Sequence, residues 1–401
     1  MLYNIKYFIR QYLKFLMEIR VRKKKRIKIV FVLAEVAAWK TESLYQMMLI
    51  HSRFVPILAL THSKDIPNAY GLLKEYISLK QYDYVELDLS KTIINQLHPD
   101  IIFFQKPYDG SYPFLHSPRT NRRALLAYVP YGFHNIMEPW AFKLFIHQNC
   151  WQHYHENDIC AKTTIDHLGR NRKSVVVTGI PIMDELLIPM EKLSDVWKDK
   201  KHRKRIIYAP HHTIGNDNAS GISYSTFLEY ADFILHLAKK YSKDTYWAFK
   251  PHPSLKEKLI KVWGKQRATN YYLAWEHLEN SQVEEGKYIE LFKFSDAMIH
   301  DCSTFTQEYL YTCNPVLYLV RDELYTHTRN LNEFALNTFN LHYHATSREE
   351  IEQFVKNVIS GKDILKNQRD SFYEKSLLPP YGKTSCENII NSILGIEEYK
   401  T

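Results

Sequence analysis

The chain has 401 residues, of which 45% are hydrophobic and 24% charged, a composition typical of a folded protein with two domains. Its net charge of +9 resides in residues 1–28, and the other 373 residues balance 43 basic against 43 acidic groups, which excludes a general polyanion-binding protein. Five cysteines without a CxxC pair exclude a disulfide framework and favour a reducing cytosol. We expect no membrane-spanning segment, no secretory signal and no nucleic-acid partner.

The first segment, residues 1–27, has the pattern of a basic amphipathic helix followed by a linker. Lys6, Arg10 and Lys14 form a row at four-residue spacing, and a basic cluster follows at 22–26. We expect residues 1–26 to lie on an anionic membrane surface; packing of the helix against the body is the alternative. Apolar side chains recur on another face, as an interfacial helix requires: Leu2, Ile5, Ile9, Tyr12, Leu13 and Leu16.

Beyond residue 27, short apolar runs alternate with helical stretches, which predicts parallel, doubly wound sheets. A polar, charged stretch from 189 to 205 is typical of an interdomain linker. We therefore predict an α/β fold with two facing Rossmann-like domains, at 28–190 and 205–380, followed by a C-terminal helix over 381–401. The expected strands are 27–35, 54–61, 100–105, 125–132, 174–181, 205–212, 245–253, 296–303 and 315–320.

Polar motifs follow several of these strands, where doubly wound folds bind ligands. In Lys250-Pro251-His252-Pro253, two prolines present His252 so that it can donate a hydrogen bond to phosphate or carry a proton. In 301–308, either Ser303 or Thr304 would cap a helix whose N-terminus favours an anion, and Glu308 could reach a ribose hydroxyl.

Histidines follow two further strands. His211 and His212 come after Tyr208-Ala209-Pro210, and we expect no metal there because adjacent side chains on extended backbone point to opposite sides. The pairs His153/His155 and His342/His344 give no better support for a metal. In the first domain, His134 follows Gly132 and is a candidate general base, because imidazole titrates near neutral pH.

Six stretches, in this order, resemble the CDP-glycerol glycerophosphotransferase family, whose members build teichoic acids and related capsular polymers. The resemblance covers roughly residues 28–395. The stretches are PDIIFFQKPY (99–108), TGIPIMDELL (178–187), YAPHH (208–212), KPHP (250–253), DAMIHDCSTFTQEYLYTCNPVLYL (296–319) and YGKTSCENII (381–390).

The resemblance implies a GT-B type fold and transfer of a polyol phosphate, expected to be glycerol phosphate, from a CDP-activated donor to a hydroxyl of a lipid-linked polymer, with release of CMP. It implies no cofactor, and peripheral attachment to the cytoplasmic face of the cell membrane. By the same resemblance His252, Ser303 and Thr304 would contact the diphosphate, Glu308 the ribose, and His134 would be the base. Lys250 and Asp301 belong to the matching motifs and are expected in the substrate site.

Two departures from the family pattern leave alternatives open. The chain lacks the Trp-His-Gly-Thr-Pro stretch usual around the position of His134, and the Trp-Arg usual after Pro210, for which His211 or His212 could substitute. A glycosyltransferase of the same fold that uses a nucleotide-sugar is the first alternative. A nucleotide-sugar epimerase, or a membrane-docked binding protein without catalysis, would also fit the pattern.

Overall fold

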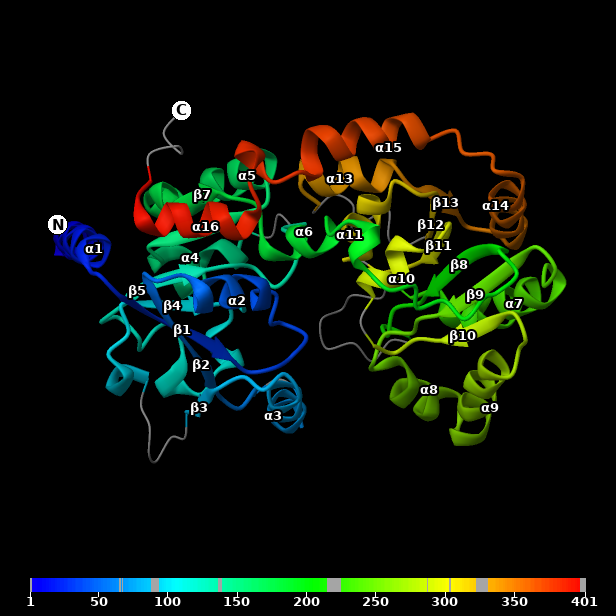
Figure 1. Ribbon diagram of the computed structural model, residues 1–401, viewed down its shortest axis with the longest axis horizontal. Helices are drawn as coiled ribbons and strands as arrows, with labels where there is room; N and C mark the ends of the chain where they lie inside the picture. Colours follow the sequence, from blue (N-terminus) through cyan, green and yellow to red (C-terminus); the bar gives the residue numbers. More distant parts are fainter. Residues whose placement is uncertain are drawn as a thin grey trace. The chain divides into compact units, whose positions relative to one another are not determined.

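The computed structural model describes residues 2–64, 66, 68–87, 94–135, 139–214, 225–286, 288–302, 304–321 and 331–396. The chain divides into two compact units (Figure 1). Unit 1 comprises Met1–Glu185 and Leu378–Thr401, and unit 2 comprises Leu186–Leu377. The division falls within helix α6 (Pro181–Leu186) and not in the charged stretch 189–205, and the C-terminal helix belongs to unit 1 instead of standing apart.

Unit 1 is built on a parallel sheet in which the described residues form seven strands, in the order β3-β2-β1-β4-β5-β6-β7. The order runs outward from β1 in one direction and from β4 in the other, so the topological switch point lies between these two strands. The strands are β1 (Ile27–Leu33), β2 (Phe54–Leu60), β3 (Tyr84–Glu86), β4 (Ile101–Phe104), β5 (Leu125–Tyr128), β6 (Gln152–His155) and β7 (Val175–Val177). The helices are α1 (Leu2–Lys23), α2 (Glu42–Ile50), α3 (Ala69–Leu79), α4 (Phe145–Asn149), α5 (Asp158–Leu168), α6 and α16 (Ser385–Leu394).

Unit 2 repeats this plan with six parallel strands in its described part, in the order β10-β9-β8-β11-β12-β13. Its switch point lies between β8 and β11. The strands are β8 (Lys204–Ala209), β9 (Thr245–Phe249), β10 (Ser281–Val283), β11 (Ala297–His300), β12 (Val316–Leu319) and β13 (Tyr343–Ala345). The helices are α7 (Phe227–Lys240), α8 (Leu255–Trp263), α9 (Lys265–Glu276), α10 (Ile289–Lys293), α11 (Phe305–Glu308), α13 (Glu333–Asn340), α14 (Arg348–Ser360) and α15 (Lys366–Phe372).

The core of unit 2 follows from the two-residue period of its strands. Alternate strand residues, such as Tyr208 on β8 and Trp247 and Phe249 on β9, point to one face and are fully buried. Helices α7, α9 and α14 cover that face with apolar side chains at helical spacing. This packing fixes the sheet whose strand ends present the polar motifs.

The predicted fold class is confirmed, since both halves are doubly wound parallel α/β domains and a helix precedes the first strand. All nine expected strand segments contain a strand. The sequence reading missed β3, β6, β10 and β13, which have only three or four residues each.

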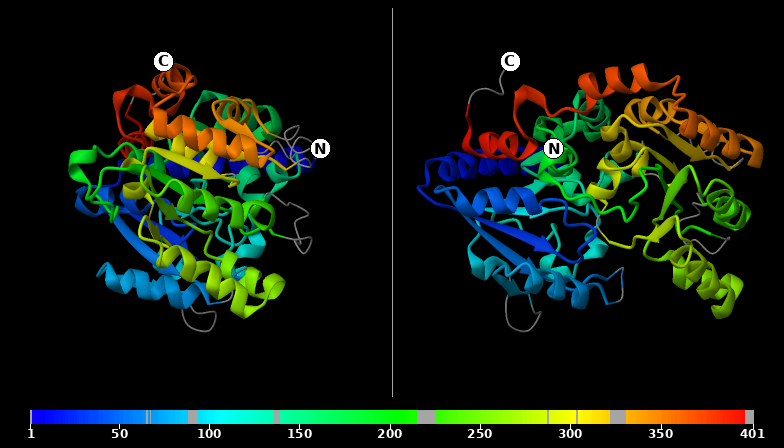
Figure 2. Two further views of the ribbon diagram at one scale, coloured as in Figure 1. Left: turned by 90° about the vertical axis from the view of Figure 1, so that its right-hand side faces the viewer. Right: turned by 45° about the vertical axis from the view of Figure 1, so that its right-hand side comes forward.

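Helix α16 returns to unit 1 and is held there by motif residues. The Asp184 carboxylate accepts hydrogen bonds from the backbone N–H groups of Ser385 (2.6 Å) and Cys386 (2.8 Å) at the start of the helix. Gly179 has a φ of +74°, and a Cβ there would lie 2.3 Å from Ser385 Oγ, so this position requires glycine. Arg22 donates to the Ser392 carbonyl, and α1 lies beside α16 (Figure 2). Two of the six family-like stretches, 178–187 and 381–390, therefore contact each other and fix α16 on unit 1.

Helix α1 presents an apolar face to solvent, with exposed side chains at Phe8, Ile9, Tyr12, Leu13, Phe15 and Leu16. Two cations of the basic row of this helix, Arg10 and Lys14, contact unit 1. Arg10 hydrogen-bonds the Asn149 side chain, and Lys14 Nζ donates to the Cys150 carbonyl at 3.0 Å. Among the described residues, none of the helices combines the length and apolar character needed to cross a bilayer.

Candidate active site

Three histidines meet at the carboxyl ends of β8 and β9 in unit 2. These strands are parallel neighbours, so the residues that follow them emerge at the same edge of the sheet. The ring centroids of His212 and His252 lie 4.1 Å apart, and that of His211 lies 4.4 Å from His212 and 5.3 Å from His252. The expectation that adjacent His211 and His212 would diverge is wrong, because β8 ends at Ala209 and the chain bends at His212.

Asp301 follows β11 at the switch point of the sheet and contacts the backbone of this histidine group. Its buried carboxylate accepts hydrogen bonds from the backbone N–H of His211 (2.5 Å) and from the backbone N–H (2.7 Å) and hydroxyl (3.1 Å) of Thr226. Burial raises the pKa of Asp301 to about 6, and these donors limit the increase. Since Asp301 is fully buried and bonded to protein donors, its place is that of a positioning residue.

The other predicted residues of unit 2 surround the same strand ends. Lys250 is buried and its Nζ donates to the Gly286 carbonyl at 2.8 Å; burial lowers its pKa to about 8, which nearby glutamates including Glu308 oppose. Thr304 is exposed before α11 and its side chain makes no capping hydrogen bond, while Glu308 is buried within α11. Ser303 lies outside the described residues.

The electrostatics of the histidine group favour an anion. Burial lowers the pKa of His211 to about 2, of His212 to about 4 and of His252 to about 3, and the positive charge of Lys258 acts in the same direction on all three. The imidazoles are therefore neutral at physiological pH and offer N–H donors. The Asp301 carboxylate is already hydrogen-bonded to protein donors. The neutral imidazole N–H groups, together with the nearby lysine, are therefore suited to bind phosphate oxygens.

His134 belongs to unit 1, on the loop that follows β5, and it is paired with Glu156 at the end of β6. Glu156 Oε2 lies 3.0 Å from His134 Nδ1, and Oε1 accepts the His134 backbone N–H at 2.5 Å. Glu156 is fully buried, whereas the His134 side chain is 17% exposed. Burial favours a higher pKa for Glu156, but the contacts with His134 and His155 outweigh it and hold that pKa well below its usual value. The sequence reading missed Glu156, although it directly follows the His-Tyr-His run.

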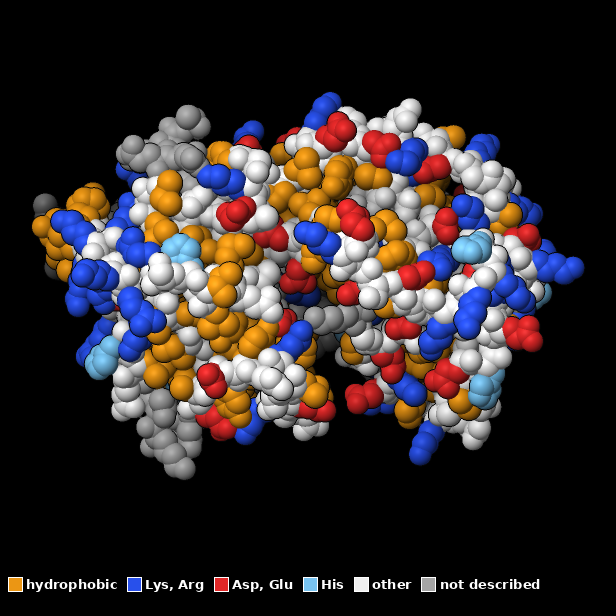
Figure 3. Space-filling view, in the orientation of Figure 1, with side chains coloured by type: hydrophobic (Ala, Val, Ile, Leu, Met, Phe, Trp, Pro, Cys, Tyr) orange, Lys and Arg blue, Asp and Glu red, His pale blue; other side chains and the backbone are white. Residues whose placement is uncertain are grey.

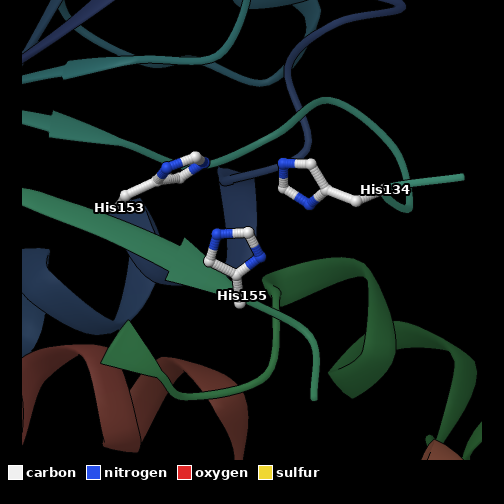
Figure 4. A group of neighbouring side chains, drawn as sticks. All are labelled: His134, His153 and His155. Carbon is white, nitrogen blue, oxygen red and sulfur yellow. The ribbon is translucent and has the colours of Figure 1, made fainter. Parts of the chain in front are cut away.

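Two further histidines of unit 1, His153 and His155, complete a cluster around His134 (Figure 4). They are two residues apart on β6 and so point to the same face of the sheet, and both are fully buried. Ring centroids lie 4.4 Å apart for His134 and His155, 4.3 Å for His153 and His155, and 5.4 Å for His134 and His153. From the sequence this pair gave no better support for a metal than His211 and His212, and β6 was not among the expected strands.

Solved structures with a similar fold include proteins with two different activities. The chain is similar to the wall teichoic acid polymerase TagF in a crystal soaked with CDPG (13% identity, TM-score 0.63, covering 98% of this chain and 96% of that one). It is similar also to a UDP-N-acetylglucosamine 2-epimerase from Listeria monocytogenes (15% identity, TM-score 0.59, 92% and 96%) and to S. aureus MnaA with UDP (18% identity, TM-score 0.59, 92% and 96%). No curated protein matches the chain.

These likenesses define the class: a two-domain α/β enzyme fold that transferases and nucleotide-sugar epimerases share. The family model described as CDP-glycerol:poly(glycerophosphate) glycerophosphotransferase matches residues 153–395. The chain therefore belongs to the CDP-glycerol glycerophosphotransferase family and is an enzyme of the glycerol-phosphate or teichoic-acid transferase type. The match includes every predicted site residue of unit 2, and it begins after His134.

Proposed function

We propose that this enzyme transfers glycerol phosphate from CDP-glycerol to a hydroxyl of a lipid-linked surface polymer and releases CMP. Family membership and the fold shared with TagF support the donor class. The observation that carries the proposal is the meeting of His211, His212 and His252 beside Lys258 at the strand ends of unit 2. That environment suits the diphosphate of a nucleotide donor.

In the proposed reaction, the acceptor oxygen attacks the phosphorus that carries glycerol. A phosphorus–oxygen bond to the acceptor forms, the bond between that phosphorus and the bridging oxygen breaks, and CMP leaves with the bridging oxygen. The imidazole N–H groups and Lys258 would stabilise charge on the phosphates, which is the main task in phosphoryl transfer. The roles of Ser303 and Thr304 at the diphosphate, and of Glu308 at the ribose, stay predictions from the family resemblance.

The acceptor hydroxyl must lose a proton, and His134 is the proposed base. Its Nδ1 is hydrogen-bonded to the Glu156 carboxylate, which would fix the ring and stabilise the imidazolium once Nε2 takes the proton. A histidine oriented by a buried carboxylate is a recurrent base arrangement in enzymes.

The proposal is tested by incubating the purified protein with radiolabelled CDP-glycerol and a lipid-linked acceptor. We expect label in the lipid fraction and an equal amount of CMP. CDP-ribitol and UDP-N-acetylglucosamine serve as competing donors in parallel reactions. Turnover of the UDP-sugar in place of CDP-glycerol would identify a glycosyltransferase or an epimerase, and binding of CDP-glycerol without CMP release would identify a binding protein.

We further propose that α1 attaches the enzyme peripherally to the cytoplasmic face of the membrane, where a lipid-linked acceptor would be found. Hydrophobic side chains gather at the α1 end of unit 1 with Lys and Arg beside them (Figure 3). Exposed cations of this segment include Arg20, Lys23, Lys25 and Arg26. An exposed apolar face flanked by cations is the pattern of a helix in the headgroup layer.

Replacing both Leu13 and Leu16 with Asp should weaken binding to vesicles of 70% phosphatidylcholine and 30% phosphatidylglycerol at least about tenfold. Each exposed leucine inserted into the interface contributes about 1.5 kcal/mol or more. Co-sedimentation with the vesicles measures the change. The matched control is Ile50→Asp, which changes an exposed apolar residue on α2 outside the proposed membrane face; this variant should bind as the unmodified protein does. Equal sedimentation of all three proteins would exclude this role for α1.

A further inference from the structure

The two histidine clusters of this protein differ in the charge placed against them. In both, three imidazoles offer ligand atoms that lie within 4.8 Å of one another. Lys258 acts on the unit 2 cluster and disfavours a cation there. In unit 1 the neighbouring charge is negative, because the fully buried Glu156 lies 3.0 Å from His134 Nδ1 and 3.7 Å from His155 Nδ1. The unit 1 cluster is therefore suited to a cation.

The burial of the unit 1 cluster also needs an explanation. Both ring nitrogens of His153 are buried and have no hydrogen-bond partner within the part of the chain that the structure describes. A buried polar atom left without a partner costs about 1–3 kcal/mol. Packing alone does not account for an imidazole in that position, since an apolar ring would fill the space without this cost. A bond from His153 to a metal ion would remove it.

We propose that His134, His153 and His155 bind a zinc ion, with Glu156 as the outer carboxylate that orients His134. Three imidazoles with one open position form a known type of zinc centre. Histidine ligands commonly donate their second N–H to a carboxylate, and Glu156 bonds Nδ1 of His134, so Nε2 is the nitrogen that His134 would offer (Figure 4). Tetrahedral coordination at about 2.0–2.1 Å needs nitrogens about 3.4 Å apart. The ligand nitrogens now lie within 4.8 Å of one another, and rotation about the soft χ2 torsions of the histidines can shorten these distances to the value that zinc needs.

The zinc site and the base role of His134 are alternatives for one nitrogen. With zinc bound, the open position would take the acceptor hydroxyl and lower its pKa, so that the proton leaves to water and not to His134. This catalytic use rests on the proposed function, but zinc binding itself does not. His153 separates the two models, because a base model leaves it dispensable whereas a zinc site requires it.

The test is the zinc content of the full-length protein, grown with zinc and freed of loosely held metal, by mass spectrometry. We expect about one zinc per chain in the unmodified protein, almost none in His153→Ala and His155→Ala, and about 10- to 100-fold weaker binding in Glu156→Gln. His167→Ala, an exposed histidine on α5, and His252→Ala in the other cluster are controls that should keep the metal. Cobalt substituted for zinc should give the visible absorption of a four-coordinate ion.

Three results would overturn the proposal: an unmodified protein without zinc, undiminished zinc in His153→Ala, or loss of zinc from His252→Ala alone. If the alanine variants do not fold, the unmodified protein still decides the question. Added ZnCl₂ should then raise the melting temperature of the chelator-treated protein, and no shift would count against a site. CDP-glycerol turnover by the zinc-free protein would leave the proposed function standing and would refute the catalytic use of zinc, whereas the zinc content alone decides whether the site exists.

Discussion

His252→Ala is expected to lower the rate of CMP release from CDP-glycerol by about 100- to 1000-fold while the protein stays folded. The imidazole stands at the end of β9 between His212 and the start of α8, and burial keeps it neutral, so it acts as an N–H donor to the diphosphate. Removing one such preorganised donor from a transition state has an effect of this size. Initial rates at saturating CDP-glycerol, together with circular dichroism of the variant, measure both parts of the expectation.

Two further variants make this result specific. His236→Ala removes an exposed histidine of α7 in the same unit and should keep full activity. His252→Gln keeps an N–H donor but cannot exchange a proton near neutral pH, so partial recovery would identify His252 as a donor to phosphate. A rate within threefold of the unmodified enzyme for His252→Ala would refute its assignment.

Acidification from pH 7.5 to 5.5 is expected to lower the free energy of unfolding of unit 2 by about 4 kcal/mol. Burial lowers the pKa of His300 to about 3 and of His342 well below the usual value, and the pKa values of His211 and His252 are lowered as described above. The unfolded chain binds protons at these sites below about pH 6.5 while the folded chain does not. Each fully buried histidine then costs about 1.4 kcal/mol at pH 5.5, and the two partly exposed ones cost less.

Asp301 acts in the opposite direction. Its pKa in the folded state is about 6, above the value of 3.8 in the unfolded chain, so the folded state takes up a proton first as the pH falls. This contributes about 0.8 kcal/mol of stability at pH 5.5, which does not offset the histidines.

Urea unfolding followed by tryptophan fluorescence at the two pH values measures the difference, because Trp247 and Trp275 are buried in the core of unit 2. His342→Gln serves as the comparison, since it removes one of the titrating groups. This variant should unfold more easily at pH 7.5 but lose about 1.4 kcal/mol less on acidification. Equal unfolding midpoints at both pH values would contradict the expectation.

The sequence predicted the fold well where burial is achieved with apolar residues. Segments such as 27–33 and 245–249 are runs of hydrophobic and aromatic residues that form central strands, and they are recognisable by composition alone. Strand β6 reads Gln-His-Tyr-His, and every residue in it is buried. A reading based on hydrophobicity passes over such a strand, and with it His153, His155 and Glu156.

For the candidate site of unit 2, the sequence predicted which histidines follow strands but only partly how their side chains are arranged. Motif positions placed His211, His212 and His252 at strand ends, and the adjacency of β8 and β9 brings them together. The direction of each ring depends on the bend of the chain after Pro210, and no sequence pattern predicts that bend. Asp301, which was expected in the substrate site, accepts hydrogen bonds from the backbone of His211 and from Thr226 at the start of α7, because a carboxylate buried at the switch point needs donors from the chain itself.

The return of α16 to unit 1 has a consequence for synthesis on the ribosome. Unit 2 is encoded by one uninterrupted stretch, Leu186–Leu377, and all of its residues are translated before those of α16. Unit 1 lacks the helix whose backbone N–H groups satisfy Asp184 until all of unit 2 has been translated. The nascent chain therefore carries an incomplete first half while the second half folds, and the order of completion is the reverse of the order of translation.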